Sequence, residues 1–320
     1  MSGPASHHPD REAGARAARA HSRGDLAVAE QAYAEATAAG DPRAAYQLGV
    51  LRHQRGAVDE AIKAFQMAAQ AGDSDALVAL ANIYADNLDR TDEAVALYSQ
   101  AMADGNRLAA VELGVLRQRQ GERRVAESLF RKAAQAGSPE ALLRLGQLLA
   151  DEDREAEAIA PLRSAVEMGL DGAENYLGAA LAALGEFAEA EATLMPGARA
   201  GDPEASRLLG HALHAQLRLE DAEREFERAI ERGHAPALLD YGDLLVDWGR
   251  HDEAEAIYRR AIDLGQSDAH LALAELYAAL DRTSDAKSEF EAALAKGVSG
   301  ALSSYATHLP ELAPGADSET

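Results

Sequence analysis

A glycine recurs along almost the whole chain at a nearly constant interval. Every interval is 32 residues except the second, which is 33. Self-similarity at a fixed period predicts a stack of small structural units, each of which contacts only its neighbours. Such a fold grows by addition, so a chain of 320 residues needs no single large core. The recurring residues are Gly40, Gly72, Gly105, Gly137, Gly169, Gly201, Gly233, Gly265 and Gly297.

Each unit reads as two helices, which we call helix A and helix B. In the copy that follows Gly40, Asp41 is a helix-capping residue and Pro42 suits the first turn of helix A. Gly56 then predicts a short turn before helix B. Apolar residues recur in both helices at i, i+4 and i+7, the spacing of one helical face. The two faces consist of Ala44, Leu48 and Leu51, and of Ala61, Phe65 and Ala68.

A small residue follows the large helix A residue, a leucine or a tyrosine, in every copy. Glycine inside a helix costs about 1 kcal/mol relative to alanine, so its recurrence needs a packing reason. We expect helix B to cross at this point, with the two backbones too close for a larger side chain. The series runs Gly49, Ala81, Gly114, Gly146, Gly178, Gly210, Gly242, Ala274 and Ala306.

The alternating small and large positions resemble the tetratricopeptide repeat. The join Ala68-Ala69-Gln70-Ala71-Gly72 is similar to that of the Sel1-like repeat. The resemblance covers roughly residues 8–309 and implies an all-α, right-handed α-solenoid of about nine repeats. A last helix over Gly300–Leu309, stopped by Pro310, is expected to cap the array. We expect residues 1–7 and the acidic residues 310–320 to be disordered tails.

Composition limits the classes of function. The net charge of −23 argues against binding along nucleic acid and favours a basic or neutral protein or peptide partner. The absence of cysteine excludes disulfides and thiolate metal sites. No apolar run suits a signal peptide or a membrane span, so we expect a cytoplasmic protein without membrane contact. The excess of arginine over lysine hints at a bacterial source. The oligomeric state stays open.

By the resemblance, helix A lines a concave groove, and the residues that differ between copies are the binding candidates. The family's carboxylate clamp, built from lysines, asparagines and an arginine, is not reproduced here, because Tyr46 and Val50 stand at its positions. The groove candidates are Tyr46, Asn82, Gln147, Asn175, Arg207, His211, His214, Asp240, Asp243, Asp247 and Glu275.

The densest polar cluster joins two successive helices A, with a pairing of His211 and Asp243 as the expected contact between them. Three interpretations stay open: a partly solvated network of ion pairs, a ligand-recognition surface, or a metal site formed by His211, Asp243 and Glu275. We expect no metal and no cofactor, because rigid helices seldom place three ligands at metal-bond distance.

Two prolines interrupt the pattern of helix B in the middle of the array. Pro161 lies inside one predicted helix B, and Pro196-Gly197 is predicted to interrupt the next. They indicate either a local kink or a hinge. Trp248, the only tryptophan, is either local packing or an aromatic anchor for a bound peptide.

The sequence favours a non-enzymatic interaction scaffold that holds a peptide or a partner helix in its groove. No nucleophile elbow, phosphate-binding glycine loop or metalloprotease helix is found. The alternative is a regulatory sensor whose superhelix closes on a small peptide or metabolite. An enzyme that uses the region of His211 and Asp243 is the third possibility, and it lacks an evident nucleophile.

Overall fold

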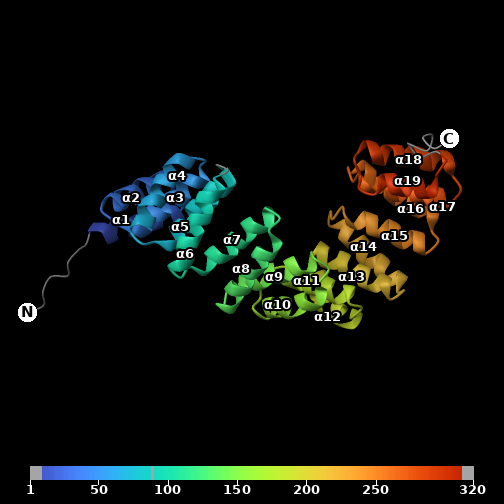
Figure 1. Ribbon diagram of the computed structural model, residues 1–320, viewed down its shortest axis with the longest axis horizontal. Coiled ribbons are helices and arrows are strands. Elements are labelled where there is room, and N and C mark those ends of the chain that lie inside the picture. Colours follow the sequence, from blue (N-terminus) through green and yellow to red (C-terminus); the bar gives the residue numbers. More distant parts are fainter. Residues whose placement is uncertain (1–8, 88–89, 312–320) are drawn as a thin grey trace, which may run out of the picture. The chain divides into compact units, whose positions relative to one another are not determined.

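The computed structural model describes residues 9–87 and 90–311, and all regular structure within them is α-helical (Figure 1). These residues form 19 helices, which alternate between helix A (odd numbers) and helix B (even numbers). The chain divides into two compact units, Met1–Leu148 (unit 1) and Leu149–Thr320 (unit 2). The predicted all-α solenoid of paired helices is thereby confirmed.

In unit 1, each helix from α1 to α7 packs against the next one along the chain. Successive helices A also touch, as α5 and α7 do. The boundary between the units falls in the last turn of α9. The helices are α1 (Pro9–Ser22), α2 (Leu26–Ala38), α3 (Pro42–Gln54), α4 (Val58–Gln70), α5 (Ser74–Asn87), α6 (Thr91–Ala103), α7 (Arg107–Arg119), α8 (Arg123–Gln135) and α9 (Pro139–Ala150).

Unit 2 repeats the arrangement. Each helix from α10 to α18 packs against the next, and the helices A form a continuous row in which α11, α13, α15, α17 and α19 touch in turn. The helices are α10 (Glu155–Glu167), α11 (Ala173–Ala183), α12 (Phe187–Ala200), α13 (Pro203–Ala215), α14 (Leu219–Glu231), α15 (Ala237–Asp247), α16 (His251–Asp263), α17 (Asp268–Ala279), α18 (Thr283–Ala295) and α19 (Ala301–His308).

The joins between repeats follow the predicted pattern, in which a glycine is followed by a helix-capping residue. Gly201 ends α12 with a φ of 99°, a left-handed conformation that glycine adopts without steric cost. Asp202 then caps α13, and its carboxylate accepts a hydrogen bond from the Glu204 amide at 2.9 Å. The helices are short, 8 to 14 residues each, so packing rather than intrinsic propensity holds them.

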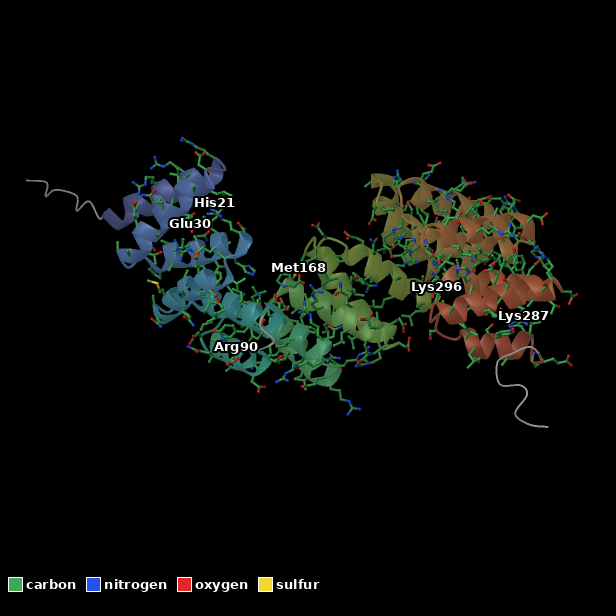
Figure 2. The ribbon with its side chains drawn as sticks, turned by 90° about the horizontal axis from the view of Figure 1, so that it is seen from above. His21, Glu30, Arg90, Met168, Lys287 and Lys296 are labelled. Atoms are coloured by element: carbon green, nitrogen blue, oxygen red, sulfur yellow. The ribbon has the colours of Figure 1, made fainter. Side chains whose placement is uncertain are left out.

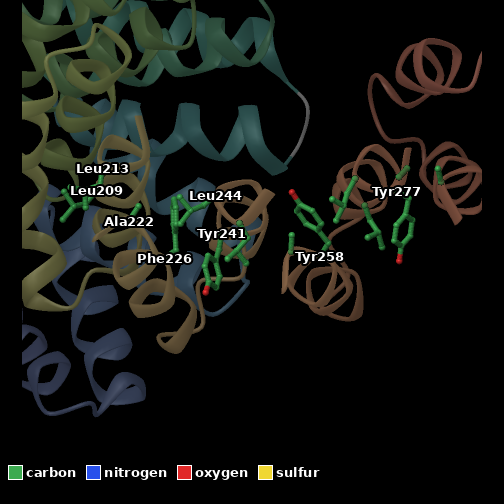
Figure 3. Close-up of a cluster of buried hydrophobic side chains, with 14 of the residues drawn as sticks. Leu209, Leu213, Ala222, Phe226, Tyr241, Leu244, Tyr258 and Tyr277 are labelled. Carbon is green, nitrogen blue, oxygen red and sulfur yellow. The ribbon is translucent and has the colours of Figure 1, made fainter. Parts of the chain in front are cut away.

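In each unit the core lies between the helices A and the helices B. Alanines of helix B, among them Ala222 and Ala254, are fully buried and let the helices approach closely. One large side chain per repeat fills the space beside them, as Phe226 and Tyr258 do in unit 2 (Figure 3). Burial of such a side chain stabilises the fold by roughly 1.5–3 kcal/mol, so each repeat contributes its own section of core.

The recurring glycine of helix A has a different cause from the one expected. A Cβ atom added to Gly210 would lie 2.6 Å from Cε1 of the Phe226 ring, and one added to Gly49 would lie 2.6 Å from Cε1 of Phe65. The obstacle is therefore the buried large side chain of helix B, an aromatic ring in these two repeats and Leu194 against Gly178, and not a crossing backbone. The expectation of a backbone contact was wrong.

The two prolines do not end their helices. Helix α10 continues through Pro161, and α12 continues through Pro196. The predicted interruption of helix B at Pro196 is therefore wrong. Each of these two helices has a leucine that is fully buried in the core, Leu162 in α10 and Leu194 in α12.

The array ends as predicted on a lone helix A. Helix α19 packs against α17 and α18, and it begins one residue later and ends one residue earlier than the predicted Gly300–Leu309. The predicted tail 1–7 and most of the predicted tail 310–320 lie outside the described residues, as do residues 88 and 89.

Candidate functional site

The predicted groove residues all lie on helices A. Three of them belong to unit 1 and eight to unit 2. Within unit 2 the structure brings most of the polar candidates into contact with one another or with a neighbouring side chain. The candidates are Tyr46 on α3, Asn82 on α5, Gln147 on α9, Asn175 on α11, Arg207, His211 and His214 on α13, Asp240, Asp243 and Asp247 on α15, and Glu275 on α17.

In unit 1, two of the three candidates have structural partners. The Asn82 side chain accepts a hydrogen bond from the hydroxyl of Tyr98, the large side chain of its own helix B. The Tyr46 ring packs against Phe65 with ring centroids 5.7 Å apart. Gln147 is partly buried on α9. In unit 2, Asn175 donates to the Asp202 carboxylate at 2.8 Å and so supports a helix cap.

Arg207 is the centre of a charged network between α13 and α15. Its Nη2 donates to Glu204 at 2.7 Å, and its Nη1 donates to Oδ2 of Asp240 at 3.1 Å. Burial raises the pKa of Asp240, but the contacts with His211 and Arg207 outweigh it and hold that pKa below its ordinary value. The guanidinium therefore bridges carboxylates from two successive helices A.

The two histidines of α13 pair with the same row of aspartates, but not in the predicted way. His211 Nε2 lies 3.0 Å from Oδ2 of Asp240, and His214 Nε2 lies 3.0 Å from Oδ2 of Asp247. The expected pairing of His211 with Asp243 is wrong, because Asp243 accepts a 2.6 Å hydrogen bond from the Tyr258 hydroxyl instead. No group of three ligand-type side chains among the described residues has the geometry of a metal site.

A hollow of about 340 Å³ opens beside this network, between α15 and α17. We call it the acidic hollow. Three carboxylates face it, from Asp243, Asp247 and Glu275. Between them lie apolar side chains and two rings: the rest of the lining is Val246, Tyr258, Ala272, Leu276, Ala279 and His308.

The acidic hollow carries negative charge that the chain neutralises only in part. The described residues give Asp243 one hydrogen bond, from Tyr258, and give Glu275 one, from the Ser304 hydroxyl at 2.6 Å. Burial raises the pKa of Asp243, and the neighbouring charges of Asp240 and Asp247 raise it further. Burial likewise raises the pKa of Tyr258, so its phenol stays protonated and able to donate.

No lysine or arginine of the described residues reaches the acidic hollow within ion-pair distance of Asp243 or Glu275. The two lysines of unit 2, Lys287 and Lys296, lie on α18 or at its C-terminus (Figure 2). Neither lines the hollow. Lys287 is paired with Glu291 of the same helix at 3.8 Å.

Sequence reasoning missed several residues of the hollow, among them Tyr258, Ala272 and His308. One signal could have found Tyr258. Where the large side chain of helix B is Tyr98 or Tyr258, the tenth residue after the repeat glycine is the acceptor Asn82 or Asp243. Where it is Phe65, that residue is a valine.

Trp248 directly follows α15 and is engaged locally. The guanidinium carbon of Arg250 lies 4.7 Å from the centroid of the indole ring, a cation–π contact. Of the two interpretations of Trp248, this contact favours local packing over an aromatic anchor for a peptide.

The helix pairs and their row of polar helix A residues define the class of α-helical tandem repeat proteins. Within that class, the family profile described as tetratricopeptide repeat matches residues 15–76, 111–173 and 207–269. The chain belongs to the tetratricopeptide repeat family. Its fold is also that of a solved Sel1 repeat protein.

Solved structures with the same fold are distant in sequence. The protective antigen c5321 of uropathogenic Escherichia coli, which displays an SLR fold, is 22% identical with a TM-score of 0.62, over 86% of this chain and 66% of that protein. A Sel1 repeat protein from Oxalobacter formigenes is 21% identical with a TM-score of 0.57, over 93% of both chains. PilW, a type IV pilus biogenesis factor, is 23% identical with a TM-score of 0.51, over 58% of this chain and 91% of PilW.

The search of curated proteins found no significant match. Among the described residues, no helix combines the length and the apolar character needed to cross a membrane.

Proposed function

We propose that the protein is a non-enzymatic interaction scaffold and that the helix A face of unit 2 binds a peptide or a helix of a partner protein. The observation that carries the proposal is the acidic hollow, an open space of about 340 Å³ with three carboxylates in its lining. A fold that serves only its own packing does not require charged side chains around an open hollow.

The family supports the same reading, because this repeat fold commonly mediates protein–protein interaction. The charge of the surface selects the partner. A net charge of −23 and a hollow with partly unneutralised carboxylates favour a basic partner, both by attraction at long range and by contact. The polar side chains Asn82 and Asn175 are explained by internal hydrogen bonds, so the binding surface centres on α13, α15 and α17.

The proposal is tested by quantitative affinity capture from native lysate with two matched variants. The first carries Asp243→Lys and Glu275→Lys in the acidic hollow. The second carries Glu231→Lys and Asp263→Lys at the exposed ends of α14 and α16, and so changes the net charge equally outside the hollow. We expect at least one partner to be retained by the second variant and reduced more than tenfold by the first. Equal loss from both variants would contradict the proposal.

A further inference from the structure

We propose that the acidic hollow is a receptor for one arginine side chain of the bound partner. The inference rests on the proposed function and adds the chemistry of the group that is recognised. It rests on a comparison within the chain. The equivalent positions one repeat earlier in unit 2 hold side chains that pair with one another, and the positions at the hollow do not.

One repeat earlier, between α13 and α15, the chain fills the corresponding space with its own basic side chains. His211 and His214 extend from α13 and lie 3.0 Å from the carboxylates of Asp240 and Asp247 on α15. Arg207 adds its guanidinium to Asp240 from the same helix. At this step, helix A of one repeat supplies the cations and helix A of the next supplies the anions.

Between α15 and α17 the corresponding residues, 32 positions later, do not form these ion pairs. Asp243 and Val246 replace the two histidines, so this face of α15 no longer carries a cation. Ala272 and Ala279 replace the two aspartates, and their small side chains leave room for the hollow. Carboxylates line the hollow from both helices: Asp243 and Asp247 lie on α15, where Asp247 also pairs with His214, and Glu275 lies on α17. The ion pairs of the earlier repeat are thus absent here, and Asp243 and Glu275 accept hydrogen bonds from Tyr258 and Ser304 without a cation from the described residues at ion-pair distance.

The lining matches the chemistry of an arginine side chain. Val246, Leu276 and the two alanines offer apolar contact for its three methylene groups, while the carboxylates surround the position of its charged head. A guanidinium has five donors in a rigid plane and can bond carboxylates of two helices at once, which a compact ammonium does less well. Arg207 shows this geometry within the same unit, bridging Glu204 on α13 and Asp240 on α15.

The test is a titration of the full-length protein, labelled at alanine, valine and leucine methyl groups, with N-acetyl-arginine-N-methylamide at low ionic strength. The neutral isostere N-acetyl-citrulline-N-methylamide is the matched ligand. We expect saturable shifts of the methyl signals of Val246, Ala272, Leu276 and Ala279 with the arginine compound, and at least tenfold weaker binding of the citrulline compound. The lysine analogue should bind more weakly than the arginine compound.

Two variants complete the test. Asp243→Asn removes the charge and keeps an oxygen that can accept the Tyr258 hydrogen bond, as Asn82 does from Tyr98. Asp263→Asn removes the same charge at the exposed end of α16. We expect the first to weaken binding of the arginine compound tenfold or more, and the second to change it less than twofold.

Equal shifts with both ligands, equal effects of both variants, or no shift at millimolar ligand would overturn the proposal. The outcome of the lysate capture described above does not depend on the outcome of this titration. A partner that depends on the helix A face can exist without an arginine receptor, and the arginine compound can bind even where no partner is captured.

Discussion

At the scale of single residues, Leu217 stands in a backbone conformation that suits glycine. It occupies the turn between α13 and α14 with a φ of 58°, where Gly56, Gly185 and Gly249 stand in other repeats. Its side chain is 81% exposed and gains little from packing. The left-handed conformation costs an L-residue roughly 1–2 kcal/mol.

Leu217→Gly should therefore stabilise unit 2, by about 1 kcal/mol after the entropy cost of glycine in the unfolded chain. Urea unfolding of the two proteins measures the difference. Asp281→Gly, at an equivalent turn with a φ of 57°, should give a smaller gain because aspartate tolerates this conformation better. A loss of stability in Leu217→Gly would contradict the strain assigned to the leucine.

Gly210 presents the opposite case, in which a side chain is excluded. A Cβ atom there would lie 2.6 Å from the Phe226 ring, which is fully buried. We expect Gly210→Val to destabilise the protein by about 2–3 kcal/mol through overpacking. Ala215→Val, at an exposed position of the same helix, should change the free energy of unfolding by less than about 0.5 kcal/mol. Thermal unfolding of both variants checks the comparison, and similar losses in the two would rule out the ring as the cause.

Two aspartates on one helix should respond to pH with opposite signs. The pKa of Asp243 is raised above its model-peptide value of 3.8, so the native state binds its proton more readily than the unfolded state does. Its contribution to stability is therefore lost as the pH rises through the native pKa. The pKa of Asp240 is lowered below 3.8, so its contribution is present at neutral pH and is lost as the pH falls through the native pKa.

At neutral pH, Asp243→Asn should therefore stabilise unit 2 and Asp240→Asn should destabilise it. Unfolding by urea at neutral pH and again near pH 4 measures both differences, and each should shrink at the lower pH. A decrease of stability in Asp243→Asn at neutral pH would contradict the unneutralised charge assigned to the acidic hollow.

At the scale of elements, the ion-pair network joins α13 to α15. The Arg207 and Asp240 side chains are only 21% and 18% exposed, so loss of the guanidinium leaves carboxylates that are partly shielded from water. Arg207→Gln should cost about 1–2 kcal/mol of stability. Arg224→Gln removes the more exposed ion pair with Asp221 and should cost less than about 0.5 kcal/mol of stability. Equal costs in urea unfolding would show that the network does not join the two helices.

Element by element, the period of the sequence predicted the helix pairs well because each repeat makes its own caps and its own section of core. It could not predict the partner of His211. Asp240 and Asp243 are three residues apart on one helical face, so both lie within reach of α13, and only the geometry decides between them. The hydrogen bond from Tyr258 engages Asp243 and leaves Asp240 to the histidine.

The prolines show a second limit of the pattern. A proline inside a helix removes one backbone hydrogen bond. Pro196-Gly197 was therefore predicted to interrupt its helix. In both α10 and α12 the buried leucine and alanine rows hold the chain in helical form across the proline. The hinge interpretation of this region stays a prediction.

At the scale of the whole molecule, the repeated residues account for the fold and the departures from the repeat account for the candidate site. The acidic hollow arises from Ala272 and Ala279, which are inconspicuous in a chain rich in alanine. Their meaning appears only when each is compared with the aspartate 32 positions earlier, and when the structure shows what those aspartates contact. Composition alone indicated an acidic molecule and a basic or neutral partner, but not where the charge is left unneutralised.

The most direct test of the central claim is photocrosslinking in native lysate with one photoreactive residue per protein. The residue replaces one of two alanines: Ala272 in the acidic hollow, or Ala256, which is exposed on α16 and does not line the hollow. We predict that the Ala272 position captures a basic partner reproducibly, that the captured peptide contains arginine, and that the Ala256 position does not capture it. Capture of the same proteins from both positions, or of none from Ala272, would contradict the assignment of the helix A face of unit 2 as the binding surface.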